Sequence, residues 1–132
     1  MDLELRQRFS VGAFDLAWDE WGSGSGAPLV IVHGFGGSAF DFASQIAALA
    51  ANRRVLAIEL RGHGRSSKSS DLESYTIDHI VDDLAAWLPT VVDEPIHLLG
   101  HSMGGRVSMR FGFIRRDLVR SMILANTTAW KF

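Results

Sequence analysis

Hydrophobic and polar positions along the chain change their period at Pro28. Before it, residues 13–19 alternate between larger apolar side chains and small or acidic ones, the period-2 pattern of a half-buried β-strand. Val11-Gly12 suits a turn, so residues 3–21 are predicted to form an antiparallel hairpin. The Gly/Ser segment at residues 23–26 is flexible and too short to link two domains.

After Pro28, short apolar runs alternate with segments of helical period. Continuous runs of this kind are typical of strands buried on both faces of a helix-covered parallel sheet, and they occupy residues 29–32, 55–58, 96–99 and 121–125. The helical pattern is clearest over residues 77–88, with Thr76 as the predicted cap and Pro89 just beyond the end. It is weaker over residues 39–51 and returns over residues 103–115. The order predicts an α/β fold: a mostly parallel sheet, made of an N-terminal antiparallel hairpin plus four buried strands, with helices on both faces.

Composition narrows the class of protein. A chain of 132 residues forms at most one domain, and 47% apolar with 21% charged residues indicates a globular one. The net charge of −2 gives no reason to expect nucleic acid or an anionic membrane as a partner. The absence of cysteine excludes disulfides and thiolate metal sites. No signal peptide or membrane-spanning run is present, so the protein is predicted to be soluble and cytoplasmic.

The segment Gly100-His101-Ser102-Met103-Gly104-Gly105 carries a G-x-S-x-G pattern between an apolar run and a helical one. In this setting a sharp strand-to-helix turn presents a serine hydroxyl as a nucleophile. Small residues are needed on both sides of the turn, and Gly100 and Gly104 supply them. The N-terminus of the following helix favours negative charge there. An ordinary turn with an exposed serine is the alternative, but the position between a buried strand and a helix favours the nucleophile.

Two further loops lie at the ends of predicted strands. His33-Gly34-Phe35-Gly36-Gly37-Ser38 follows the first buried strand, and backbone N–H groups of such a glycine-rich loop can face a developing oxyanion. Taken alone it is more simply a strand-to-helix turn, yet its spacing from Ser102 reinforces the oxyanion interpretation. The segment Glu59–Ser66 is predicted to be a structural turn, in which Arg61 and Arg65 tie loops together, more than a site for a catalytic His63.

Together the motifs H-G-F-G-G-S, E-L-R-G-H-G-R-S and G-H-S-M-G-G, in this order and spacing, resemble the N-terminal half of the α/β-hydrolase superfamily. The most similar members are its esterases, lactonases and carbon–carbon-bond hydrolases, and the resemblance covers essentially the whole chain. It implies Ser102 as nucleophile, an oxyanion hole from the N–H groups of Phe35 and Met103, and substrate contacts at Gly34, Phe35 and Met103. It implies no metal and no organic cofactor. A serine at this position argues against the dehalogenase and epoxide-hydrolase branches, which use aspartate there.

The chain also departs from the family pattern. Members of the family are about twice as long and continue with a lid and two further strands, which carry the triad acid, the histidine and most of the pocket. Only thirty residues follow Ser102 here, and none is a histidine. Residues 1–132 are therefore expected to form a partial hydrolase core, lacking the lid and the C-terminal strands, with little or no turnover by itself. Glu59 stands where relatives commonly have aspartate, which we interpret as a tolerated change.

No residue inside the chain is predicted to replace the missing base. Among the five histidines, His97 is expected in the core, His79 at the surface, and His101 pointing away from Ser102. His33 and His63 are expected at the same end of the sheet as Ser102, without a carboxylate to orient them. Asp117, the one acid after Ser102, is expected at the opposite end of the sheet.

Two functions from different classes follow. The first is a serine hydrolase module for small carboxylic esters, lactones or related acyl compounds, whose acid and histidine lie elsewhere. The second is a catalytically inactive fold fragment that acts through an exposed edge strand, residues 121–125, in a homodimer or with a complementing C-terminal half. A truncated form of a longer enzyme is the explanation we favour for the chain's length. The substrate is not predicted, because Phe35, Phe40, Phe42 and Trp130 suit either an apolar pocket or the core.

Overall fold

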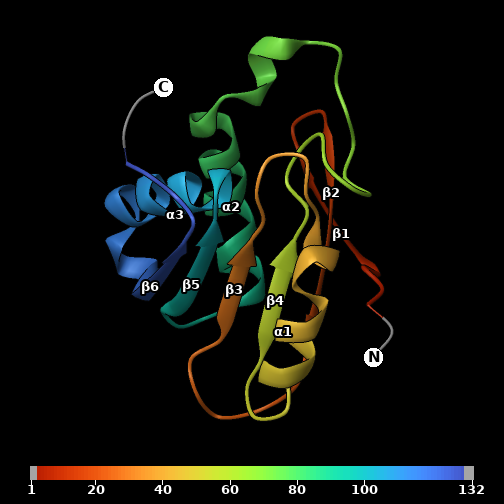
Figure 1. Ribbon diagram of the computed structural model, residues 1–132. Coiled ribbons are helices and arrows are strands. Elements are labelled where there is room, and N and C mark those ends of the chain that lie inside the picture. The colour runs from red at the N-terminus through yellow and green to blue at the C-terminus, as the bar shows by residue number, and fades with distance from the viewer. Residues whose placement is uncertain (1–2, 130–132) are drawn as a thin grey trace.

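The computed structural model describes residues 3–129, which form one six-stranded sheet with helices on both faces (Figure 1). Its strands follow the order β1-β2-β4-β3-β5-β6. They are β1 (Gln7–Val11), β2 (Phe14–Trp21), β3 (Leu29–Val32), β4 (Val55–Ile58), β5 (Ile96–His101) and β6 (Val119–Ala125). The helices are α1 (Ala43–Leu49), α2 (Ile77–Val91) and α3 (Met103–Ile114), with short 3-10 turns η1 (Ala39–Phe42), η2 (Leu72–Tyr75) and η3 (Arg116–Leu118).

The N-terminal hairpin is confirmed. Strands β1 and β2 pair antiparallel from Gln7↔Trp18 to Val11↔Phe14. Gly12 takes φ 55° in the turn, a left-handed conformation that glycine adopts without strain. Strand β2 then continues antiparallel along β4, which joins the hairpin to the rest of the sheet.

The centre of the sheet is parallel, as the apolar runs predict. Strand β3 lies between β4 and β5 and pairs in parallel with both, and β6 pairs in parallel with β5. Every residue of β3 and β4 is buried, because each strand has a helical layer on both faces. The parallel arrangement brings the carboxyl ends of β3, β4, β5 and β6 to one end of the sheet, where the chemistry-bearing loops begin.

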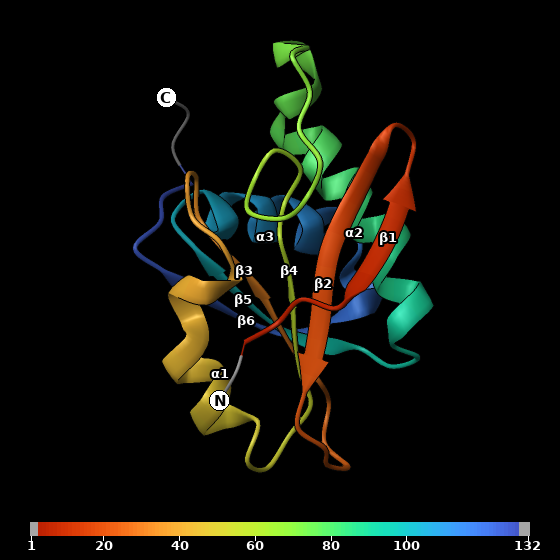
Figure 2. The ribbon, with the colours of Figure 1, turned by 90° about the vertical axis from the view of Figure 1, so that its right-hand side faces the viewer.

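Two hydrophobic layers hold the helices to the sheet. Helices α2 and α3 cover one face and α1 covers the other (Figure 2). In the larger layer Trp87 of α2 is fully buried and meets the ring of Trp18 edge-on, with ring centroids 5.5 Å apart. In the smaller layer Ile46 of α1 is fully buried against β3 and β4.

The apolar run at residues 121–125, for which the sequence predicts a strand exposed at an edge, lies in β6, and this strand is less buried than β3, β4 and β5. None of its residues is fully buried, and Ile123 and Leu124 are 50% and 44% exposed. The physical reason is its place in the sheet: within residues 3–129 it is an edge strand that pairs only with β5, and α1 packs over β3 and β4 instead.

Helix α2 also extends further than predicted. Thr76 caps it, since its side-chain oxygen accepts the His79 N–H, but the helix runs through Pro89 to Val91. A proline in the last turn removes one N–H donor without breaking the bonds that follow it. The Leu88 carbonyl still accepts the Val92 N–H at 3.1 Å, so the helix ends one turn late.

Candidate functional site

Ser102 lies on a strained turn between β5 and α3. Its backbone has φ 53° and ψ −119°, and it is one of two non-glycine residues with positive φ within residues 3–129. The flanking glycines are required by contact: a Cβ on Gly104 would stand 2.2 Å from the Val32 carbonyl oxygen, and one on Gly100 would stand 2.4 Å from the Gly104 carbonyl oxygen. The sharp turn predicted from G-x-S-x-G is therefore present, and we call it the Ser102 turn.

The Ser102 side chain is exposed in a pocket of about 450 Å³. Phe35 and Met103 line this pocket with it. Gly34 packs underneath, where an added Cβ would stand 3.2 Å from the Ser102 Cβ. The structure thus brings all four predicted site residues together at the carboxyl end of β5.

Four residues of the pocket wall are absent from the sequence-based prediction: Arg106, Asn126, Thr127 and Thr128. Arg106 could have been found, because a residue four positions after Ser102 on a helix lies near the same face. The other three follow β6. Because β5 and β6 are parallel neighbours, their carboxyl ends lie side by side, and this topology could have placed residues 126–128 near Ser102. Their orientation depends on a left-handed turn at Asn126, with φ 48°, which no pattern in the sequence indicates.

Two backbone amides accompany Ser102 in the pocket wall. Met103 is the first residue of α3, so its N–H has no acceptor within the helix. Phe35 lies in the glycine-rich loop, which is closed by the bond from the Gly37 N–H to the Gly34 carbonyl at 3.1 Å. Within residues 3–129, no hydrogen bond is found from the Phe35 amide.

His33 is a structural residue and not a base for Ser102. Its ring is 1% exposed, and its Nε2 accepts the Leu60 N–H at 3.0 Å. The proton therefore sits on Nδ1, which donates to the Gly34 carbonyl at 2.8 Å. Burial, above all other causes, lowers the pKa of His33 from 6.5 to about 4. Both nitrogens hold the glycine-rich loop in place.

His63 stands beside the site with one nitrogen committed. Its Nδ1 donates to the Arg61 carbonyl at 3.0 Å, and its ring lies 5.8 Å from that of Phe35. It lines a second pocket of about 300 Å³ that shares Phe35 and Met103 with the first pocket. Within residues 3–129, no hydrogen bond joins His63 to Ser102 or to a carboxylate, in agreement with the predicted lack of an orienting acid.

Within residues 3–129, none of the remaining histidines is hydrogen-bonded to Ser102. His101 lines a different pocket, with Phe42 and Leu99, so its side chain diverges from that of Ser102 as predicted. His79 is exposed at the start of α2. The prediction for His97 is wrong: its ring is half-buried, and its Nδ1 lies 2.6 Å from the hydroxyl of Ser121, because it stands beside the exposed edge strand β6.

Asp117 lies in η3, beyond the end of α3 and far from Ser102 at its start, as predicted. It is exposed and forms a two-bond pair with Arg115 at 3.0 and 2.9 Å. The hydrogen bond from Arg115 lowers the pKa of Asp117. It therefore cannot orient a base at the Ser102 turn.

The aromatic residues that suited either a pocket or the core have different surroundings. Phe35 is 83% exposed at the pocket, whereas Phe40 does not line it and Phe42 packs against the α1 layer. Trp130 lies outside the described residues.

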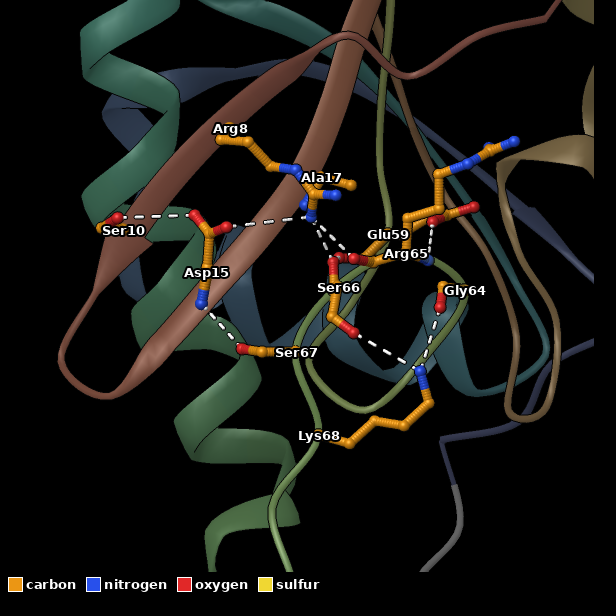
Figure 3. A network of polar contacts seen from close by, with 10 residues as sticks. All are labelled: Arg8, Ser10, Asp15, Ala17, Glu59, Gly64, Arg65, Ser66, Ser67 and Lys68. Carbon is orange, nitrogen blue, oxygen red and sulfur yellow. Dashed lines mark hydrogen bonds and ion pairs between the residues drawn. The ribbon is translucent and has the colours of Figure 1, made fainter.

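The loop after β4 is fixed by a polar network (Figure 3). The Ser66 hydroxyl accepts the Ala17 N–H at 2.9 Å and donates to the Glu59 carbonyl at 2.5 Å. The Ser67 hydroxyl accepts the Asp15 N–H at 2.7 Å. The Glu59 side chain, fully buried, accepts the Arg65 N–H at 2.5 Å. The loop that carries His63 is thereby bound to the N-terminal hairpin.

Arg61 has the structural role that the sequence predicts. It forms a buried two-bond pair with Asp83 of α2, at 2.7 and 2.6 Å, and donates to the Ser74 carbonyl at 2.8 Å. Its guanidinium also stacks 4.0 Å from the centre of the Phe14 ring. One side chain therefore ties together the hairpin, the loop after β4, and α2.

Neither a metal-binding cluster nor a membrane-spanning helix is found among residues 3–129. No group of three histidine or acidic side chains there is arranged to bind a metal ion. Among the same residues, no helix has the length and apolar character needed to cross a membrane.

Comparison with known proteins gives the site its context. A family model described as alpha/beta hydrolase fold matches residues 27–132. The dihydrolipoyllysine-residue acetyltransferase component of the acetoin cleaving system of Pseudomonas putida is 41% identical over 118 residues, which make up 89% of this chain and 31% of that protein. Epoxide hydrolase B of Mycobacterium tuberculosis is 38% identical over 93 residues, 70% of this chain and 26% of that protein.

Solved structures agree with this result. An alpha/beta hydrolase fold protein from Burkholderia ambifaria superposes with a TM-score of 0.90 at 26% identity, over 98% of this chain and 47% of that one. The chain thus spans less than half the length of each of these three proteins.

Proposed function

Because the chain belongs to the α/β-hydrolase fold family, we propose that it supplies the nucleophile and the oxyanion site of a serine hydrolase. The substrates would be carboxylic esters, lactones or related acyl compounds. The observation that carries this proposal is the geometry of Ser102: an exposed hydroxyl on a strained turn, at a helix N-terminus, in a pocket shared with Phe35 and Met103.

In the proposed reaction, the Ser102 oxygen attacks the acyl carbonyl carbon and its proton passes to a base. The carbonyl oxygen becomes an oxyanion, which the N–H groups of Phe35 and Met103 stabilise together with the dipole of α3. Collapse of this intermediate expels the alcohol, which takes up the proton, and leaves an acyl group on Ser102. Water then attacks the acyl group and releases the acid.

The base is assigned to a group outside this chain. His33 has both nitrogens occupied, and within residues 3–129 no histidine is hydrogen-bonded to Ser102. An oxyanion site with binding but without a functional triad retains only about 10³–10⁴-fold catalysis over water. We therefore expect the chain by itself to turn over esters slowly or not at all.

Two observations bear on the type of reaction. The Pseudomonas putida relative is named for acyl transfer. The serine at position 102 departs from the aspartate that the family resemblance implies for epoxide hydrolases, so we do not extend the activity of that branch to this chain.

Rescue by added imidazole tests the proposal. The open pocket exposes Ser102, so imidazole can act as the missing base while a fluorophosphonate probe reports attack by the hydroxyl. Labelling is measured by mass spectrometry in the wild type, in Ser102→Ala, and in Ser70→Ala, which removes an exposed serine outside the pocket. We expect labelling at Ser102 that rises with imidazole concentration, is unchanged in Ser70→Ala and is lost in Ser102→Ala. Absence of Ser102 labelling at every imidazole concentration would refute the proposal.

A second candidate function rests on the edge strand β6. Ile123 and Leu124 are exposed there, and an unpaired strand edge can bind another strand. In this case the chain would be a non-catalytic unit that forms a homodimer through β6. Light scattering after size-exclusion chromatography tests it, with Ile123→Lys compared with Leu72→Lys, a change at an apolar residue 80% exposed in η2. Dimerisation lost only in Ile123→Lys supports this function, and a monomeric wild type at high concentration contradicts it.

A further inference from the structure

The end of β6 binds both backbone groups of Ser102. The Ala125 carbonyl accepts the Ser102 N–H at 3.0 Å. The Thr127 hydroxyl donates to the Ser102 carbonyl at 2.6 Å. Between them, Asn126 has φ 48°, a left-handed conformation that turns the chain back over the Ser102 turn. Two residues separated by one position therefore hold the N–H and the C=O of a serine more than twenty positions earlier.

A glycine makes room for this contact. An added Cβ on Gly105 would stand 2.6 Å from the Cβ, Cγ2 and Oγ1 atoms of Thr127 alike. The Thr127 side chain thus lies directly on the first turn of α3, in the space that Gly105 leaves open. The contact fixes both the methyl and the hydroxyl of Thr127 against the Ser102 turn.

The bonds from β6 differ in effect from those within the helix. The Ser102 carbonyl also accepts the Gly105 N–H at 3.0 Å and the Arg106 N–H at 3.4 Å, but those bonds belong to the first turn of α3 and would move with it. The bonds to Ala125 and Thr127 instead join the turn to the neighbouring strand. A non-glycine residue at positive φ persists only where its surroundings hold it. For Ser102, that restraint comes from the end of β6.

We propose that Thr127 is a positioning residue for Ser102, an inference that rests on the proposed function. Its hydroxyl holds the Ser102 carbonyl, which keeps the backbone in its strained conformation and the Ser102 oxygen directed into the pocket. Thr127 acts through Ser102 and takes no part in proton transfer or oxyanion binding.

Three variants separate positioning from stability. Thr127→Val keeps the branched shape that packs on Gly105 and removes the hydroxyl, whereas Thr127→Ser keeps the hydroxyl. Thr90→Val is the matched control, because the Thr90 hydroxyl also donates to a backbone carbonyl, that of Trp87, at 2.6 Å, but near the end of α2. Each is measured by the imidazole-supported labelling rate of Ser102 and by the NMR chemical shifts of the Ser102 amide nitrogen and carbonyl carbon.

We expect Thr127→Val to label about tenfold more slowly, the scale of one lost positioning bond, and to shift the Ser102 resonances. Thr127→Ser should restore the labelling rate and the wild-type resonances, and Thr90→Val should leave both unchanged. Labelling of Thr127→Val at the wild-type rate, or no rescue by Thr127→Ser, would overturn the positioning role. If the wild type is not labelled, the proposed function fails, and the Ser102 resonances alone then decide whether Thr127 holds the turn: unchanged shifts in Thr127→Val refute it.

Discussion

Acid should destabilise this protein through His33 in particular. The ring is buried with its Nε2 accepting from Leu60 and its Nδ1 donating to Gly34, an arrangement available only to the neutral form. Burial lowers the pKa of His33 from 6.5 to about 4. The Gly34 hydrogen bond opposes this shift, while the nearby His63 adds to it and Asp41 opposes it.

The sign and size of the effect follow from these two pKa values. Above pH 6.5, His33 is neutral in the folded and the unfolded chain and has no effect on the pH dependence. As the pH falls from 6.5 towards 4, the unfolded chain binds a proton that the folded chain excludes, so the free energy of unfolding falls. The difference of about 2.5 pKa units corresponds to a loss of about 3 kcal/mol when the pH has reached about 4.

Urea denaturation followed by tryptophan fluorescence measures this loss, since Trp87 is fully buried in the core. The perturbation is His33→Gln, whose amide oxygen can accept the Leu60 N–H without titrating. We expect this variant to be less stable than the wild type near neutral pH, by about 1 kcal/mol for an imperfect buried bond. Between about pH 6.5 and 4, the free energy of unfolding of His33→Gln should fall by about 3 kcal/mol less than that of the wild type.

The half-buried His63 provides the control. His63→Gln removes the neighbouring ring but leaves the burial of His33, the largest cause of its lowered pKa, in place, so most of the wild-type pH dependence should remain. An unfolding free energy that falls equally steeply in His33→Gln and in the wild type would refute the assignment of this acid sensitivity to His33.

The remaining predictions concern packing and the buried ion pair. Asp83→Ala should lower the free energy of unfolding by about 3–5 kcal/mol in urea titrations, because it leaves the Arg61 guanidinium buried without its partner; a loss below about 1 kcal/mol would contradict this. Gly104→Ala should lower the thermal midpoint and the Ser102 labelling rate, since its Cβ would meet the Val32 carbonyl oxygen at 2.2 Å. Gly26→Ala, where an added Cβ meets nothing within 4 Å, should change neither, and equal melting of the two variants would refute the argument.

Local sequence determines the parts of the fold that depend on neighbours along the chain. The apolar runs of β3 and β4 have the same bounds in sequence and structure, because burial on both faces leaves no polar position in a central strand. The Ser102 turn was predictable for the same kind of reason: glycines at 100 and 104 are the residues that close contact with strand and helix allows. The structural role of His33 was not predictable, because the hydrogen bond that its ring accepts from the Leu60 N–H joins the ends of two strands distant in the sequence.

Hydrophobic periodicity and the placement of glycines are enough to predict the α/β fold and the presentation of Ser102, with Gly34, Phe35 and Met103 around it. Periodicity and close steric contacts involve residues that are near one another in the chain, so both can be recognised from the sequence. The tertiary structure was needed to show that His33 is held neutral and that Thr127 bonds to Ser102. Those properties depend on which segments distant in the chain meet in space and on how much water they exclude. The serine is therefore a local feature of the sequence, whereas its restraint belongs to the fold.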